Sequence, residues 1–437
     1  MRRADTCPPA WRDGKRYAWL LGLLVPTLPF LVYALVRFTG VEALWFFGPV
    51  LLFGIFPIID LVVGVDDANP PDSVIKWLEQ DRYYRWCTYA FLPIQYAGLA
   101  FACLLWSDGR LSTLDSVGLA LTMGMVSGIA INTAHELGHK RASLERWLSR
   151  VALASSAYGH FYIEHNRGHH VRVATPEDPA SARLGESFWA FLPRTVAGSL
   201  RSSWALERER LSRADRSPWT WRNDILGAWA MTVVLFAVLA SLFGPVVLPY
   251  LLIQAVVGFS LLEVVNYVEH YGLLRELHDD GRYERCTPRH SWNSNNVASN
   301  VLLYHLQRHS DHHANPTRRY QALRHFEEAP QLPTGYAGMI VLAYIPPLWR
   351  HVMDPRLLAH YHGDAGRANV HPRARRRYWP SVMSRYRCPA CDYVYEESGG
   401  DPHEGFPPGT AWSAVDDDWH CPDCGVRDKI DFEPLED

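Results

Sequence analysis

The stretch LDSVGLALTMGMVSGIAINTA, residues 114–134, runs directly into HELGH, residues 135–139. A helix of about 20 apolar residues spans the roughly 30 Å hydrocarbon core of a bilayer. The two histidines that follow are four residues apart, so a continuing helix presents both imidazoles on one face. This junction therefore predicts a membrane helix whose end carries a pair of candidate metal ligands.

Five other segments are long and apolar enough, or nearly so, to cross a membrane. Short connections join the six segments in pairs, which predicts three helical hairpins. Long buried helices of a soluble protein are the alternative interpretation, and the number of such runs in one chain argues against it. The predicted spans are residues 17–36, 43–63, 88–106, 114–134, 226–243 and 245–265.

The distribution of positive charge predicts how these spans are oriented. Arg and Lys concentrate in the N-terminal segment, in the 65–87 loop and in the 140–223 region, whereas the tight turns carry little beyond Arg37 and Arg110. Because basic loops tend to stay in the cytoplasm, we expect both termini on the cytoplasmic side of a bacterial inner membrane. Asp60 lies inside the second span, where a role in a site and a role at the membrane interface both remain open.

Histidines recur in three further places on the same predicted side of the membrane. Imidazole is a ligand for Fe, Zn and Cu, and nine imidazoles are too many for one ion. Two ions with four or five ligands each fit this number, and a redox metal that activates O₂ explains it better than zinc. His305 lies four residues before His309 and could also reach the site, but we expect it to lie outside the ligand set. The predicted ligands are His135, His139, His165, His169, His170, His270, His309, His312 and His313.

Four carboxylates stand beside these histidines in the sequence. Metal-bound imidazoles usually pass their other N–H to a carboxylate or a carbonyl oxygen, which fixes the ring. We therefore expect these acids to support the ligands from outside the metal shell. They are Glu136, Glu164, Glu269 and Asp311.

The C-terminal segment differs from the rest in charge and in cysteine content. Residues 388–437 hold 14 acidic residues against Arg427 and Lys429, a net charge of −12, and the remainder of the chain carries +9. Two CxxC pairs in this segment supply four thiolates, and their spacing alone permits either zinc or a single iron. The predicted metal-binding cysteines are Cys388, Cys391, Cys421 and Cys424.

A basic stretch separates the acidic segment from the membrane part. Charge runs of this kind are typical of solvated linkers, and this one could also touch anionic lipid headgroups. The sequence thus predicts three parts: a membrane domain at residues 1–366, a linker at 367–387 and a small metal-binding domain at 388–437.

Longer strings around the histidines resemble a known family. HELGHK (135–140), GHHVRVATPEDPAS (168–181), NYVEHYG (266–272) and LQRHSDHHANPTRRY (306–320) are similar to the integral-membrane, non-haem di-iron alkane 1-monooxygenases. The likeness covers roughly residues 15–365. The string around His270 separates this family from the fatty-acid desaturases, which share the other histidine clusters.

The cysteine-rich segment resembles rubredoxin throughout residues 388–432. The similar strings are YVY (393–395), GDP (400–402), PGTAW (408–412) and DDW (417–419). The metal stabilises much of so short a domain. The resemblance implies a small aromatic core of Tyr393, Trp412, Trp419 and Phe432.

The two resemblances together imply a fold. It is an α-helical integral membrane domain of six transmembrane helices, with a cytoplasmic helical cap that carries the histidines. A small rubredoxin-like iron-binding domain follows. The implied cofactors are two non-haem Fe ions on the nine histidines and one Fe(Cys)₄ rubredoxin iron.

The resemblance also implies terminal hydroxylation of medium- and long-chain n-alkanes to 1-alkanols with O₂. No catalytic residue beyond the metal ligands is expected. Electrons would pass from an NAD(P)H-dependent rubredoxin reductase through the fused rubredoxin. The expected partners are thus the alkane, O₂, the reductase and the lipid bilayer, with no nucleic acid. Trp45, Phe53 and Phe56 are candidates for lining a substrate channel, with packing or lipid contact as the alternative.

Two other functions remain open on the sequence. A fatty-acyl or lipid desaturase or hydroxylase of the same superfamily would use the same histidines. A metal-sensing or electron-transfer membrane protein with a zinc ribbon would not be an enzyme at all. The string around His270 and the rubredoxin-like segment argue against the desaturase.

Overall fold

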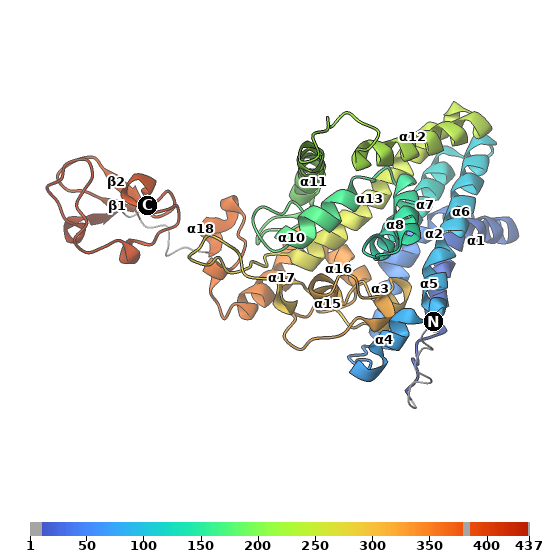
Figure 1. The fold of residues 1–437 in the computed structure, drawn as a ribbon, viewed down its shortest axis with the longest axis horizontal. Coiled ribbons are helices and arrows are strands. Elements are labelled where there is room, and N and C mark those ends of the chain that lie inside the picture. The colour runs from blue at the N-terminus through green and yellow to red at the C-terminus, as the bar shows by residue number, and fades with distance from the viewer. Residues whose placement is uncertain (1–10, 379–384, 436–437) are drawn as a thin grey trace. The chain divides into compact units, whose positions relative to one another are not determined.

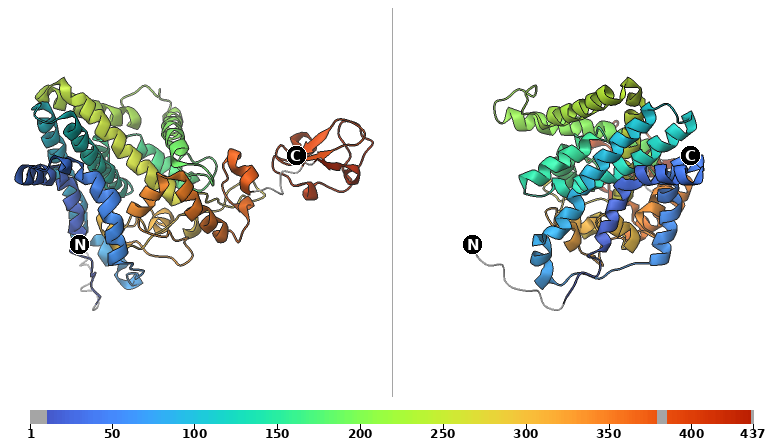
Figure 2. Two further views of the ribbon diagram at one scale, coloured as in Figure 1. Left: turned by 180° about the vertical axis from the view of Figure 1, so that it is seen from behind. Right: turned by 90° about the vertical axis from the view of Figure 1, so that its right-hand side faces the viewer.

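The computed structural model describes residues 11–378 and 385–435. The chain divides into two compact units, residues 1–357 and 358–437. The first unit is helical, and Figure 1 shows its helices in blue to orange. Figure 2 shows from two further sides that the blue, turquoise and yellow-green helices lie against one another.

Helices make up nearly all of the first unit. The α-helices are α1 (Leu24–Thr39), α2 (Phe47–Val50), α3 (Phe56–Val63), α4 (Asp72–Gln80), α5 (Arg82–Tyr89), α6 (Phe91–Ser107), α7 (Thr113–Gly138), α8 (Ser143–Ala154), α9 (Phe161–Ile163), α10 (His170–Arg172), α11 (Phe188–Ser212), α12 (Asp224–Phe243), α13 (Leu248–His270), α14 (Val297–Leu302), α15 (His309–Ala314), α16 (Tyr336–Ala343) and α17 (Pro346–His360), and a short α18 (Arg375–Tyr378) follows in the second unit.

Six helical segments in the described residues are long and apolar enough to cross a membrane, which confirms the six predicted spans. Several observed helices extend past the predicted apolar run. Two extensions matter for the site, because α7 continues through His135 and α13 continues to His270. The spans are Ala18–Thr39, Glu42–Val63, Arg82–Ser107, Thr113–Gly138, Asp224–Phe243 and Pro245–His270.

The second span is not a uniform α-helix. It begins as a 3-10 helix, η2 (Glu42–Phe46), and passes through α2 into a π-helical turn, η3 (Leu51–Ile55), before α3. Irregular backbone at membrane depth needs polar partners from neighbouring helices. Thr122 of α7 supplies them: its hydroxyl donates to the Trp45 carbonyl at 2.7 Å and accepts from the Gly48 N–H at 3.1 Å.

Helices α7 and α13 pack closely side by side (Figure 1). Small residues allow this approach: a Cβ atom on Gly128 would lie 3.0 Å from the carbonyl oxygen of Gly258, and one on Gly124 would lie 3.3 Å from that of Gln254. Close helix contacts through small residues are typical of membrane proteins. The two helices that carry His135 and His270 are therefore held together along their length.

Asp60 is fully buried near the C-terminal end of the second span. Its carboxylate accepts hydrogen bonds from the backbone N–H of Ser299, at 2.9 Å, and from the Ser299 hydroxyl. Both contacts lie at the start of α14, where backbone N–H groups lack helical partners. Asp60 therefore anchors α14 to the second span, which is the interior role of the two left open by the sequence.

The C-terminal part of the second unit is a small sheet around aromatic side chains. Strands β1 (Arg385–Arg387), β2 (Val394–Glu396) and β3 (Glu433–Leu435) form an antiparallel sheet in the order β2-β1-β3. The predicted aromatic core is confirmed, and Tyr395 joins it as a fully buried ring. The core packs against the cysteines that the metal would hold together.

Candidate di-metal centre and substrate cavity

The ends of the two longest inner helices supply three of the nine histidines. His135 lies in the last turn of α7, and His139 ends that helix as its C-terminal cap. His270 is the last residue of α13. Because α7 and α13 pack along each other, these three imidazoles meet at one end of the bundle.

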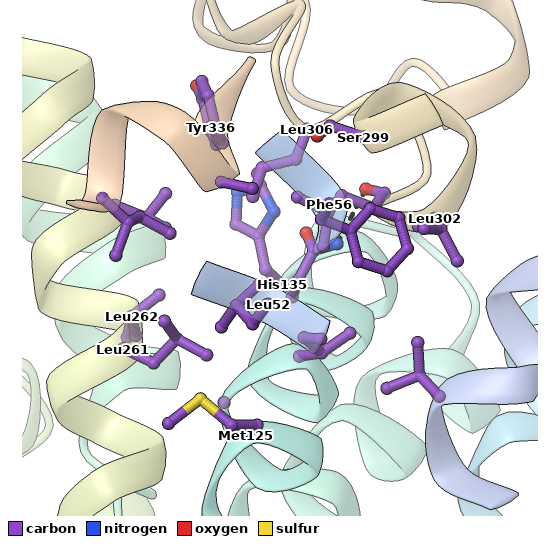
Figure 3. Close-up of a pocket in the computed structure, with 18 of the residues that line it drawn as sticks. Leu52, Phe56, Met125, His135, Leu261, Leu262, Ser299, Leu302, Leu306 and Tyr336 are labelled. Carbon is purple, nitrogen blue, oxygen red and sulfur yellow. Dashed lines mark hydrogen bonds between the residues drawn. The ribbon is translucent and has the colours of Figure 1, made fainter. Parts of the chain in front are cut away.

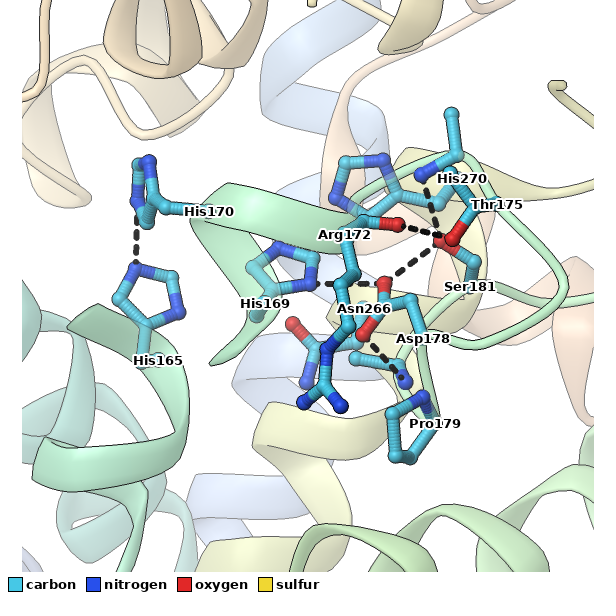
Figure 4. Close-up of polar contacts among 12 residues, drawn as sticks. His165, His169, His170, Arg172, Thr175, Asp178, Pro179, Ser181, Asn266 and His270 are labelled. Carbon is cyan, nitrogen blue, oxygen red and sulfur yellow. Dashed lines mark hydrogen bonds and ion pairs between the residues drawn. The ribbon is translucent and has the colours of Figure 1, made fainter. Parts of the chain in front are cut away.

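A π-helical turn, η4 (Glu164–His169), arranges the second histidine cluster. In a π-turn, residues five apart share one face, whereas an α-helix aligns residues three or four apart. The Nε2 atoms of His165 and His170 accordingly lie 3.0 Å apart, while the ring of His169 is directed elsewhere (Figure 4). The local sequence does not indicate this π-helical turn.

The third cluster lies on the short helix α15, and its imidazoles point to two different sides. His309 and His313 are four residues apart, and their Nε2 atoms are separated by 2.9 Å. His312 points to the other side, where its Nε2 lies 3.2 Å from that of His170.

The structure brings all nine predicted histidines together in two groups. Within each group the ligand atoms lie within 4.8 Å of one another. The first group holds five imidazoles and the second holds four. They are His135, His139, His165, His170 and His312, and His169, His270, His309 and His313.

His305 belongs to neither group. Its Nδ1 lies 2.9 Å from the Tyr320 carbonyl oxygen, and its ring packs edge-on against Trp19. Its Nε2 lies 3.4 Å from the Nζ of Lys15. His305 is therefore a packing and hydrogen-bonding residue that stands apart from the two clusters.

The imidazole nitrogens of both groups are buried, and several have a lone pair free to bind a metal ion. Burial, followed by repulsion among neighbouring imidazoles, lowers the pKa of His139, His165 and His312 well below the ordinary value, so these rings are neutral at physiological pH. The Nε2 atoms of His135, His139, His169 and His270 are buried without a hydrogen-bond partner. Orphaned buried polar atoms are costly, and a bound cation in each group would satisfy them. The residues present therefore fit a pair of metal ions.

Asp178 supports His169 from behind. Its carboxylate lies 2.9 Å from the His169 Nδ1 and accepts the Ser181 hydroxyl at 2.7 Å (Figure 4). Burial alone would raise the pKa of Asp178, but the charge and hydrogen bonding of His169, with the Ser181 hydroxyl, lower it to about 2. Asp178 was not among the predicted carboxylates, because it stands nine positions after His169 and not beside it. The only signal for it in the sequence was that it lies within the string at residues 168–181 that resembles the family.

Three of the four carboxylates singled out in the sequence bind partners other than the histidine rings. Glu136 pairs with Lys140 at 3.0 Å, Glu164 pairs with Arg172 at 2.8 Å, and Asp311 pairs with Arg318 at 2.6 Å. These ion pairs brace the segments that carry the histidines. Glu269 differs, since it lies 3.1 Å from the Nε2 of His309.

An apolar cavity extends from the membrane spans to the histidines (Figure 3). It runs between α7 and α13, with the first two spans and α16 completing its wall. His135, His165, His309 and Glu269 stand at its polar end. Its apolar wall includes Val25, Leu28, Leu51, Leu52, Phe56, Met125, Ile129, Leu261, Leu262, Val265, Leu302, Leu303, Leu306, Ala337 and Ile340.

The three channel candidates from the sequence behave differently. Phe56 lines the cavity. Trp45 and Phe53 are outside its lining: Trp45 is buried and donates its indole N–H to Glu42, and Phe53 packs edge-on against Tyr344. Aromatic type alone could not separate these positions. Phe56 shares the face of the second span on which Gly48 and Leu52 line the cavity at four-residue spacing, and Phe53 lies off that face.

The four cysteines of the small domain converge on one point. The Sγ atoms of Cys388 and Cys424 are 3.8 Å apart, and those of Cys391 and Cys421 are 3.5 Å apart. Four sulfurs at about 2.3 Å from one tetrahedral ion lie about 3.8 Å from one another. The cluster therefore has the dimensions of a single tetrathiolate metal site.

Comparison with known proteins agrees with both sites. The fatty acid desaturase family matches residues 116–343, and the rubredoxin family matches residues 385–432. The first match spans the histidine clusters, so the two groups are of the non-haem di-iron type. The second match identifies the four-cysteine cluster as a rubredoxin iron site.

Relatives narrow the family further. The chain is 47% identical to alkane 1-monooxygenase 1 of Alcanivorax borkumensis over 86% of its length and 93% of that protein. It is 47% identical to alkane 1-monooxygenase of Acinetobacter baylyi over 83% of its length and 90% of that protein. The likeness to the xylene/toluene monooxygenase hydroxylase component of Pseudomonas putida is lower, 28% over 54% of the chain and 63% of that protein. This chain, a multi-pass membrane protein, therefore belongs to the alkane 1-monooxygenase family and carries a rubredoxin domain after its di-iron domain.

Proposed function

We propose that this protein hydroxylates the terminal carbon of medium- to long-chain n-alkanes, using O₂ and electrons from its own rubredoxin domain. One observation supports the proposal most: an apolar cavity between membrane spans ends at two groups of buried imidazoles. The relatives' names point to the same substrate class. An alkane has no polar group to bind, so a long apolar wall is the only recognition available to it.

The cavity walls set both affinity and orientation. From Met125 to His135 along α7 the cavity follows ten residues, which corresponds to about 15 Å of helix. Each methylene group buried there contributes about 0.8 kcal/mol. An alkane of this length would lie along α7 and α13 with one end at the histidines. The shape of the cavity would then select the terminal methyl group.

The proposed reaction consumes one alkane, one O₂, two electrons and two protons, and yields one 1-alkanol and one water. The nine histidines would hold the two irons, which supply O₂ activation when bound. The protein itself binds the chain, keeps water away from the reacting carbon and holds the ligands in place.

The four-cysteine iron carries one electron at a time. Fusion to the membrane domain raises its effective concentration to the order of millimolar for a short linker. The acidic rubredoxin segment and the basic remainder would attract each other in a salt-dependent manner. An NAD(P)H-dependent reductase would reduce the rubredoxin iron again after each transfer. We place the termini and all three metal sites on the cytoplasmic side of a bacterial inner membrane.

The residue assignments and domain limits belong to the same proposal. The nine histidines bind the di-iron centre and the four cysteines bind the rubredoxin iron. We place the di-iron domain at residues 1–366, the linker at 367–387 and the rubredoxin domain at 388–437.

Product analysis tests this function directly. The full chain, reconstituted with a rubredoxin reductase and NAD(P)H, is offered n-alkanes from octane to hexadecane, and products are identified by gas chromatography. We expect 1-alkanols for at least part of the series. A fatty-acyl substrate is offered in a parallel assay, where a desaturase would form an unsaturated acyl product. That product, with no alkanol from any alkane, would contradict the proposal.

A further inference from the structure

The two histidine groups are unequal, five imidazoles against four. A carboxylate, Glu269, lies beside the smaller group, outside the set of four whose ligand atoms all lie within 4.8 Å of one another. The Oε2 of Glu269 lies 3.1 Å from the Nε2 of His309, and the side chain is almost fully buried. Glu269 also lines the cavity, so it faces the substrate side of the second group.

The 3.1 Å separation fits two ligands of one ion. Iron and zinc bind imidazole nitrogen and carboxylate oxygen at about 2.0–2.2 Å, so two ligands at right angles stand about 3 Å apart. The Nε2 atoms of His309 and His313, in the same group, are 2.9 Å apart. The carboxylate oxygen thus continues the spacing of the metal ligands themselves.

Hydrogen bonding does not explain this contact once His309 binds a metal. A metal-bound Nε2 carries no proton, and a carboxylate oxygen has none to give, so the two atoms would repel at 3.1 Å. His309 Nε2 also faces His313 Nε2, and a single proton could serve only one of its two neighbours. A cation placed among the three atoms satisfies all of them.

Tyr336 holds the carboxylate in position. Its hydroxyl donates to the Oε1 of Glu269 at 2.8 Å, and its ring is fully buried in α16 at the cavity wall. The second oxygen is thereby occupied, which leaves Oε2 directed at His309. The orientation is therefore built into the packing of α16 on α13.

We propose that Glu269 is a metal ligand of the second group, adding a carboxylate to His169, His270, His309 and His313, and that Tyr336 is its positioning residue. Each group would then offer five ligands to its ion. This inference rests on the proposed di-iron function. It departs from the expectation that Glu269 supports a histidine from outside the metal shell.

Mössbauer spectroscopy of the full ⁵⁷Fe-loaded chain tests the inference. In Glu269→Gln we expect one of the two di-iron signals to change its quadrupole splitting while the other stays, with the rubredoxin iron as internal reference. Tyr336→Phe keeps the carboxylate and should show a smaller shift of the same signal.

Glu263→Gln is the matched control. Glu263 is another buried carboxylate of α13, and it binds the hydroxyls of Tyr158 and Thr195. Its variant should keep the wild-type spectrum. Wild-type signals in Glu269→Gln, with both irons present, would overturn this inference alone. If Glu269→Gln does not fold, an unchanged spectrum in Tyr336→Phe overturns it. A wild-type chain without two irons outside the rubredoxin domain would instead refute the proposed function.

Discussion

The ring of His169 is fixed at Nδ1 by a buried carboxylate. Asp178 lies 2.9 Å away, and Ser181 in turn orients Asp178. A carboxylate in this place fixes the tautomer and makes the imidazole a stronger ligand. The tightness of the second iron site therefore depends on a residue that touches no metal.

Replacing Asp178 by Asn should weaken iron binding while keeping the shape of the side chain. We expect about 10- to 100-fold loss of affinity, because the amide cannot stabilise the ring as a carboxylate does. Iron retained after graded chelator treatment measures this. Asp108→Asn makes the same chemical change in an exposed turn and is the control. Equal iron retention in the two variants would refute this role of Asp178.

Residue type and spacing predicted which nine imidazoles converge on the site, but not which side chains fix their rings in position. Each histidine cluster is local in sequence, so its chemistry is visible there. Asp178 meets His169 only because the loop after α10 turns back, and Glu269 meets His309 across two elements. Such contacts depend on tertiary structure and left no local pattern to find.

At the scale of elements, the seam between α7 and α13 sets the width of the site. Gly128 lies both in this seam and on the cavity wall. A Cβ atom there would lie 2.8 Å from Leu261 Cδ2 and 3.0 Å from the Gly258 carbonyl oxygen. The backbone oxygen cannot rotate away, so a side chain at this position must separate the helices.

Gly128→Ala should therefore destabilise the membrane domain by about 1–3 kcal/mol and reduce alkane turnover. Thermal unfolding in detergent, with the rate of alkanol formation, checks both effects. Gly227→Ala in α12 is the matched control, since a Cβ there meets nothing within 4 Å. That variant should be neutral or more stable by up to about 1 kcal/mol. A stable, active Gly128→Ala protein would contradict a tight seam.

A buried ion pair joins α8 to the loop after α15. Arg319 donates two hydrogen bonds to Glu145, at 2.8 and 3.0 Å, and the Tyr89 hydroxyl donates a third at 2.9 Å. Burial would raise the pKa of Glu145, but the hydrogen bonds and charge of Arg319, with help from Tyr89, lower it below the ordinary value. The folded pKa lies below the unfolded one, so this stabilisation is present above about pH 4.3 and is lost as pH falls through the folded pKa.

Glu145→Gln should lower the stability at pH 7 by about 3 kcal/mol, because it leaves the Arg319 charge buried without its partner. The deficit should begin to shrink as the pH falls below the unfolded pKa of about 4.3, and it should disappear once the folded carboxyl also becomes neutral. Thermal midpoints of both proteins at pH 7 and pH 3.5 give the comparison. A deficit that does not change with pH would show that the charge of Glu145 is not the cause.

The spans were predictable because bilayer thickness demands about 20 apolar residues, a property that composition alone reveals. The π-turn η4 and the broken second span were not, because their backbone is fixed by partners in other helices, such as Thr122. Phe56 reaches the cavity because it lies four residues after Leu52 on the lining face of the span, and Phe53 lies off that face.

At the scale of the whole molecule, the chain carries a rubredoxin domain, which the proposed function makes the electron carrier of the di-iron centre. Its charge is opposite to that of the remainder. Fusion raises the effective concentration of the rubredoxin domain near the di-iron domain. This advantage does not require one fixed docked arrangement of the two domains.

Cutting the chain within residues 367–387 should make turnover depend on the concentration of the released rubredoxin domain. We expect about millimolar domain to be needed for the rate of the intact chain, and a further fall as salt is added. Steady-state NADH consumption and alkanol formation measure this. A cut protein that keeps the full rate at micromolar concentration would show that the linkage is unimportant.

The central claim is that nine imidazoles from separate segments hold two irons beside an apolar cavity. Metal analysis of the purified, fully active chain tests it most directly. We predict three irons per chain, one for each of the two histidine groups and one for the four cysteines. Full activity with one iron or none outside the four-cysteine site would contradict the account.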